Sequence, residues 1–211
     1  MYFLINYLIA QGFTKGDLSL VLALPVLITL FSLSRQLIGL RGLGLTCGIL
    51  VTLVITLSGI KFGLAIIVVS LIVFVLLRFL MRKWRLLYLP KTALILTFGL
   101  IILLLFAALP LGLSQKSSLL ALVLILAIAE KVILLQMEKN NREVFFNILE
   151  TLVLSTLGAS IILWPPLQSL ALNRPDVIIV ASIIVNIALG RWTGLRLNEY
   201  WRFRQVIKNI K

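Results

Sequence analysis

Long apolar runs, separated by short polar or basic stretches, dominate the chain. A membrane-spanning helix needs about 20 apolar residues, and about 17 can suffice. By that measure we predict seven spanning helices. Their expected ranges are 18–34, two helices within 43–80, then 90–111, 118–136, 144–164 and 175–190. Residues 1–17 are too short to span, and we expect them to lie outside the cytoplasm, along the membrane interface.

The boundaries between these helices follow from glycine, proline and charge. The run 43–80 is too long for one span, and the stretch from Ser58 to Gly63 breaks it with two glycines and a lysine. Proline is tolerated in the first turn of a helix because its missing N–H has no intrahelical partner there. We therefore expect helices to begin at Pro90 and at Pro175, the latter capped by Asn173. The pair Pro165-Pro166 is expected to close the sixth helix.

Composition agrees with this pattern. Hydrophobic residues make up 61% of the chain and charged residues 13%, whereas soluble domains have about 45–50% and about 25%. The expected fold class is an all-α polytopic membrane protein, with seven transmembrane helices in residues 18–194 and an amphipathic helix at 195–211. The single cysteine, Cys47, excludes an internal disulfide, and the chain has no histidine. We expect neither a metal site nor a cofactor.

The basic residues indicate the orientation in the membrane. A net charge of +13 raises the question of nucleic acid, but the cations lie in short loops, so we interpret them as topology signals and lipid contacts. Sixteen follow the odd-numbered helices and four lie on the opposite side, as the positive-inside rule requires. We therefore predict that the N-terminus lies outside and the C-terminus in the cytoplasm. The four on the outer side are Lys15, Lys61, Lys116 and Arg174.

The C-terminal segment mixes basic and aromatic residues. Residues 195–211 place Tyr200, Phe203 and Ile207 on one side of a helix, which is typical of an interfacial amphipathic helix. It can act as a membrane anchor or as a docking surface for a cytoplasmic partner. The residues predicted to contact lipid or partner are Arg191, Arg196, Glu199, Tyr200, Arg202, Phe203 and Arg204.

Two glutamates within predicted spans are the strongest candidates for a functional role. At 1.5 Å per residue, Glu130 and Glu150 each lie roughly 9 Å from the cytoplasmic interface. Lys131 follows Glu130, and Asn147 shares a helix face with Glu150. Acidic groups at such depth are costly unless they are paired or face water. They either line a substrate path or form structural ion pairs with Arg35, Arg78 or Lys131.

Small and weakly polar residues give two further candidates. Asn147, Thr151, Ser155 and Ala159 recur at a spacing of four, which is typical of close helix packing, although a substrate path is an alternative. The glycine-dense stretch from Arg41 to Gly48 also has two interpretations. Gly44 and Gly48 form a GxxxG packing pair, or the N–H groups at this helix start bind an anion, with Arg35 and Arg41 nearby.

Three motifs together resemble one bacterial family. They are Ser34 to Arg41 (SRQLIGLR), Arg85 to Pro90 (RLLYLP) and Gly194 to Arg204 (GLRLNEYWRFR), and the resemblance covers about residues 18–204. The family is a seven-transmembrane domain usually fused to an inactive transglutaminase-like domain. It is distantly similar to the membrane subunit of poly-γ-glutamate capsule synthesis. The resemblance implies a location in the bacterial inner membrane and a role in making, exporting or attaching a peptide-like product at the envelope. It also implies an ATP-grasp ligase and a transglutaminase-like envelope protein as partners.

These observations favour a non-catalytic membrane subunit that binds or passes an acidic product from a cytoplasmic ligase. Its partners would be the lipid bilayer, the ligase, the transglutaminase-like protein and a second copy of the chain, and not nucleic acid. One alternative is an autonomous secondary transporter that could couple to protons through Glu130 or Glu150. The other is an intramembrane enzyme that uses these carboxylates as acid and base, although no nucleophile or phosphate loop accompanies them.

Overall fold

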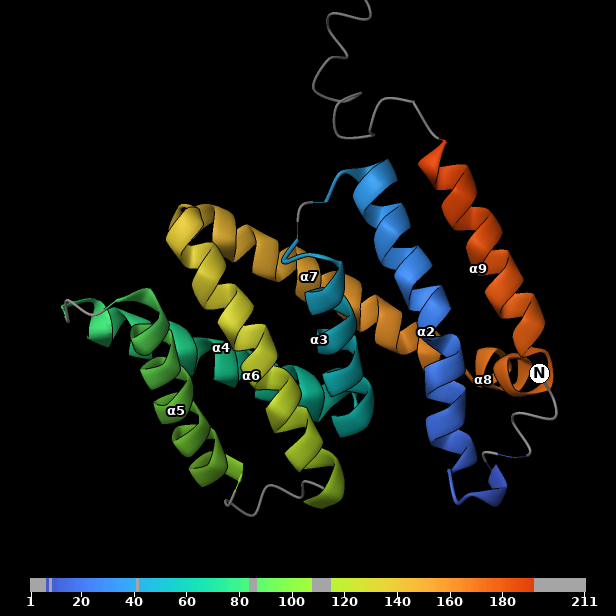
Figure 1. The fold of residues 1–211 in the computed structure, drawn as a ribbon, viewed down its shortest axis with the longest axis horizontal. Helices are drawn as coiled ribbons and strands as arrows, with labels where there is room; N and C mark the ends of the chain where they lie inside the picture. The colour runs from blue at the N-terminus through green and yellow to red at the C-terminus, as the bar shows by residue number, and fades with distance from the viewer. Residues whose placement is uncertain (1–6, 8, 41, 84–86, 108–114, 192–211) are drawn as a thin grey trace, which may run out of the picture. The chain divides into compact units, whose positions relative to one another are not determined.

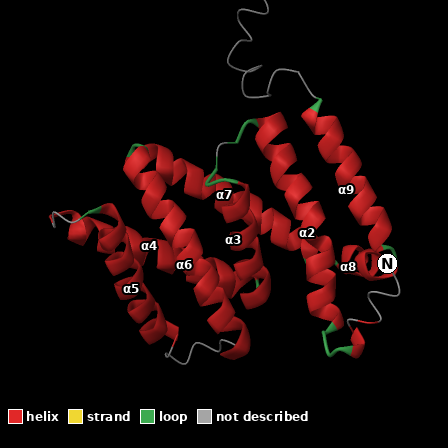
Figure 2. Cartoon of the chain, in the orientation of Figure 1, coloured by secondary structure: helices red, strands yellow, loops and turns green. Residues whose placement is uncertain are grey.

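The computed structural model describes residues 7, 9–40, 42–83, 87–107 and 115–191. Within these ranges every regular element is helical and no strand occurs (Figure 2). The all-α prediction is therefore confirmed for the described part of the chain. The chain divides into a terminal unit, residues 1–41 and 160–211, and a central unit, residues 42–159.

The terminal unit is built around α2 (Lys15–Leu33), which packs against α9 (Pro175–Gly190) and the short α8 (Pro165–Asn173) (Figure 1). Thr14 caps α2, because its Oγ1 accepts a hydrogen bond of 3.2 Å from the N–H of Asp17. At the other end, α2 continues into a π-helical turn, η1 (Ser34–Ile38), which Gly39 closes with a φ of +84°. Only glycine adopts this left-handed conformation at little cost, so η1 ends there.

The region between the sixth and seventh predicted helices differs from expectation. Pro165 and Pro166 do not only close the preceding helix; they also begin α8, because proline fits the first turn of a helix. Arg174 occupies the N-cap position of α9 without a side-chain cap, and Asn173 is the last residue of α8. The predicted cap at Asn173 is therefore wrong. The axes of α8 and α9 are bent by 104° at this break.

The central unit holds α3 (Leu45–Ser58), α4 (Ile60–Leu80), η2 (Met81–Lys83), α5 (Tyr88–Ala107), α6 (Gln115–Glu138) and most of α7 (Asn141–Ile162). Helix α3 packs mainly against α6 and α4, and α5 packs against α4 and α6 (Figure 1). The predicted break in the run 43–80 is confirmed at Gly59, where φ is +82°. Fully buried side chains that join these helices include Ile55, Phe74, Ile95 and Ile128.

Two glycines allow close helix approaches in the central unit. A Cβ atom at Gly63 would lie 2.6 Å from Cα of Ile55, so α4 touches the backbone of α3 there. A Cβ atom at Gly99 would lie 2.1 Å from Cε1 of Phe74, so the buried ring of α4 fills the space that this glycine leaves on α5. Small residues permit such close backbone approach in membrane proteins.

The helices have the length and surface of membrane-spanning elements. Four described helices are long and apolar enough to cross a membrane, or five if the bent pair of α8 and α9 forms one span. Helix α3 and residues 89–105 of α5 are shorter apolar helices. Large apolar side chains such as Leu76, Phe79 and Val123 are more than 60% exposed. So much exposed apolar surface suits lipid rather than water.

Candidate functional site

Two cations lie at the same end of the terminal unit. Arg35 is exposed on η1, and the neighbouring Gln36 donates a hydrogen bond from Nε2 to the main-chain oxygen of Leu189 near the end of α9. Arg191, also exposed, closes α9 through its N–H, which donates to the oxygen of Ile187 at 3.2 Å. The hydrogen bond from Gln36 thus joins η1, which continues α2, to the last turn of α9. The predicted basic positions Arg41 and Arg196 lie outside the described residues.

Glu150 lies half-buried on α7, against the glycine-dense segment that precedes α3. The main-chain N–H of Gly42 donates a hydrogen bond of 3.0 Å to Oε2 of Glu150. The next N–H, of Leu43, donates to Oγ1 of Thr151 at 2.8 Å. Gly42 has a φ of +44°, and a Cβ atom there would lie 3.2 Å from the same Thr151 oxygen. One N–H of this segment therefore has Glu150, a side chain of the same chain, as its hydrogen-bond acceptor.

The small polar stripe of α7 packs against the beginning of α3. Asn147, Thr151, Ser155 and Ala159 are all buried. Ser155 donates from Oγ to the oxygen of Gly48 at 3.1 Å, and Thr151 donates to the oxygen of Asn147 at 2.7 Å. These contacts agree with the packing interpretation of the stripe. Nδ2 of Asn147 is buried and has no hydrogen-bond partner among the described residues.

The GxxxG interpretation is corrected at one of its two glycines. Gly44 is the N-cap of α3 with a φ of +107°, outside the helix, and a Cβ atom there would meet no atom within 4 Å. It therefore serves the turn into the helix and not helix packing, because the left-handed conformation favours glycine. Gly48, by contrast, is buried in the contact with α7.

Glu130 and Lys131 lie side by side in α6 but away from its packed face. Both are exposed, whereas their neighbours Ala129 and Val132 are buried in the core. Neither charge has a hydrogen-bond or ion-pair partner among the residues that the structure describes. The two glutamates therefore have different surroundings in the structure. Glu150 accepts a hydrogen bond from a main-chain N–H, whereas Glu130 is exposed and accepts none from the described residues.

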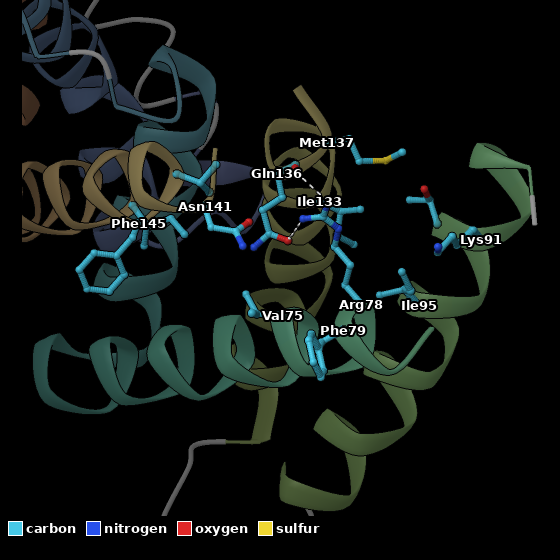
Figure 3. Close-up of a pocket in the computed structure, with 13 residues that line it drawn as sticks. Val75, Arg78, Phe79, Lys91, Ile95, Ile133, Gln136, Met137, Asn141 and Phe145 are labelled. Carbon is cyan, nitrogen blue, oxygen red and sulfur yellow. Dashed lines mark hydrogen bonds between the residues drawn. The ribbon is translucent and has the colours of Figure 1, made fainter. Parts of the chain in front are cut away.

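A pocket of about 500 Å³ lies where the ends of four helices of the central unit meet. Figure 3 shows Arg78 of α4 reaching toward Gln136 of α6, with Lys91 on the α5 side and Phe145 on the α7 side. Arg78 donates to Oε1 of Gln136 and, at 2.8 Å, to its main-chain oxygen. Sequence reasoning treated Arg78 as an ion-pair candidate and counted Lys91 only as a topology signal. The sequence did hold a signal for a shared site, because Arg78 and Lys91 flank the short connection between α4 and α5.

Several predicted positions cannot be placed. The C-terminal residues Arg196, Glu199, Tyr200, Arg202, Phe203 and Arg204 lie outside the described part of the chain, as does the predicted amphipathic helix. Among the described residues, no cluster of three or more cysteine or acidic side chains could hold a metal ion.

Comparison with known proteins identifies the family of the chain. The model of a family described as seven transmembrane helices usually fused to an inactive transglutaminase matches residues 11–207. The match confirms the family resemblance carried by the three sequence motifs. No curated protein and no solved structure matches the chain.

Proposed function

The chain belongs to this family of seven-helix membrane domains, and from that membership we propose that it is a non-catalytic subunit of an inner-membrane envelope system. It would bind and pass an acidic peptide or polyamide that a cytoplasmic ATP-grasp-type ligase makes, as in capsule biosynthesis and export. A transglutaminase-like envelope protein would be a further partner, since the family is usually fused to such a domain.

The observation that carries this proposal is the pair of exposed cations at one end of the terminal unit. Arg35 and Arg191 lie on two helix ends that the hydrogen bond from Gln36 to Leu189 joins. By the distribution of basic residues, this end faces the cytoplasm. A guanidinium group can bind a carboxylate in bidentate fashion, so two of them at one end of the unit suit an acidic product. They would therefore concentrate an acidic product at the inner surface.

Within the central unit, Glu130, Lys131 and Glu150 would also contact the product. Oε2 of Glu150 accepts a hydrogen bond of 3.0 Å from the N–H of Gly42, and a carboxylate of the product could accept a hydrogen bond from the same N–H. Glu150 would thus hold the glycine segment until product arrives. Asn147 lies one turn before Glu150 with a buried amide nitrogen that lacks a partner among the described residues, which supports a polar contact at this place.

Removal of cations at either end of the two helices tests their role. The probe is a fluorescent γ-linked glutamate oligomer, and its equilibrium binding is measured to the full chain in nanodiscs of net-neutral lipid. We expect R35A/R191A to weaken binding several-fold. The matched control is K15A/R174A, which removes two exposed cations at the other ends of the same helices. Equal losses in both double variants would show only general electrostatic attraction and would contradict the proposal.

The second candidate function is autonomous secondary transport. The exposed Glu130, which has no partner among the described residues, is the observation that favours it, because an unpaired carboxylate in a membrane helix can exchange a proton. Purified protein in liposomes discriminates the two. A transporter moves the labelled oligomer alone and responds to a pH gradient, whereas a subunit moves it only when the ligase is present.

A further inference from the structure

The ends of four helices supply polar side chains to the pocket of the central unit. Arg78 lies in the last turn of α4, Lys91 in the first turn of α5, Gln136 in the last turn of α6, and Asn141 begins α7. Lys83, Lys139 and Arg142 lie in or beside the same two connections. This end of the pocket is therefore the one that the positive-inside rule places at the cytoplasmic face.

The charge of the lining favours an anion. The side chains that line the pocket include two cations and no carboxylate. Gln136 holds the guanidinium of Arg78 through its side-chain and main-chain oxygens, so an anion meets a group that is already oriented. Lys91 is half-buried, and its ammonium has no hydrogen-bond or ion-pair partner among the described residues. A bound anion would give it one.

The rest of the lining is apolar and continues onto the outer surface of the helices. Phe79 of α4 is 74% exposed and Phe145 of α7 is 62% exposed, and both line the pocket. An apolar wall that is shared by a pocket and a lipid-facing surface suits a ligand that enters from the bilayer with its chain. The volume of about 500 Å³ exceeds that of a phosphate ion and lies within the range of about 300–1,000 Å³ for small-molecule sites.

We propose that this pocket binds an anionic lipid of the inner leaflet, with its headgroup phosphate at Arg78 and Lys91 and its chain along Phe79 and Phe145. The proposal concerns the central unit and does not depend on the function proposed above. A small soluble anion would share the charged end but would leave the apolar wall uncovered. A net-neutral lipid would cover the wall but would leave the ammonium of Lys91 without a counter-charge.

Lipid retention and melting temperature of the purified full chain in detergent test the proposal. The probes are phosphatidylglycerol, phosphatidylcholine with the same acyl chains, and glycerol phosphate without chains. Retention is measured by native mass spectrometry. We expect phosphatidylglycerol alone to be retained and to raise the melting temperature. Lys91→Ala should reduce its retention at least tenfold. Lys83→Ala is the matched control, because it removes an exposed cation of the same connection that does not line the pocket.

Each other outcome overturns the proposal. Equal losses in Lys91→Ala and Lys83→Ala would show unspecific attraction to the basic surface. A melting-temperature rise with glycerol phosphate as large as with phosphatidylglycerol would show a soluble-anion site. Equal retention of phosphatidylcholine would show that only the apolar wall matters. Lys91→Ala could also destabilise the protein, which would show as a lower melting temperature without lipid. In that case Lys91→Met, which keeps a long side chain but removes the charge, replaces Lys91→Ala in the same comparison.

Discussion

Single residues at similar predicted depth have different surroundings in this protein. Sequence spacing places Glu130 and Glu150 about equally far from the cytoplasmic interface, and it predicts the same role for both. In the structure, Glu150 accepts the N–H of Gly42 at 3.0 Å, whereas Glu130 is exposed. The difference arises because the glycine segment, more than a hundred residues earlier in the chain, packs against α7.

Neutral substitution should therefore separate the two glutamates. A hydrogen bond to a charged group contributes about 1.5–3 kcal/mol and one to a neutral group about 0.5–1.5 kcal/mol. We predict that Glu150→Gln costs about 1 kcal/mol, which lowers the melting temperature in detergent by about 2–4 °C for a chain of this size. Glu130→Gln, at an exposed position, should change stability by less than about 0.5 kcal/mol. Under the proposed function, both substitutions should lower the envelope activity measured in cells.

The opposite result would identify a structural ion pair. If Glu130→Gln destabilises the protein strongly, and if removing Lys131, Arg35 or Arg78 as well restores the melting temperature, then Glu130 is paired in the membrane. Breaking a buried pair by removing one partner costs about 3–5 kcal/mol, so this outcome is readily distinguished from the first.

Between elements, close packing of α4 and α5 depends on one glycine. A Cβ atom at Gly99 would meet the buried ring of Phe74 at 2.1 Å. Such overpacking costs about 1–3 kcal/mol. We therefore predict that Gly99→Ala lowers the melting temperature by several degrees. The double variant F74L/G99A should recover part of the loss, because the smaller side chain leaves room for the methyl group.

The control for this prediction is another helical glycine. A Cβ atom at Gly190, the last residue of α9, would meet no atom within 4 Å. Alanine also forms helices better than glycine, so Gly190→Ala should leave the melting temperature unchanged or raise it. Equal destabilisation by both substitutions would show that the effect is not the contact with Phe74.

Element boundaries were predictable where a local cause acts. Gly59 ends α3 because of its backbone conformation, and α9 runs from Pro175 to Gly190 as predicted. Helix α8 was missed because Pro165-Pro166 can either end one helix or begin another, and local chemistry permits both. The role of Gly44 was misread for a similar reason: spacing alone does not tell whether a glycine precedes the helix or lies within it.

For the whole molecule, orientation in the membrane is the prediction to test. The bias of sixteen to four basic residues predicts that the C-terminus lies in the cytoplasm. Reporter fusions at Lys211 and in the connection around Lys116 should report opposite sides, and a fusion at Arg174 should agree with the one at Lys116. The same side for Lys211 and Lys116 would contradict the seven-span arrangement. That arrangement stays a prediction for this chain, although the family is described as having seven transmembrane helices.

The sequence by itself determined the class of the protein: a helical membrane chain of the seven-transmembrane family, with its breaks at Gly59, Pro165 and Pro175. These features are local, because apolar length, glycine and proline act within a few residues. Only the tertiary structure decided which faces pack, which carboxylate meets Gly42, and that Arg78 and Lys91 share one pocket. In lipid, a side chain that faces the bilayer is as apolar as one in the core. The hydrophobic pattern therefore does not mark the inward face, and helix partners follow only from the shapes of the assembled surfaces.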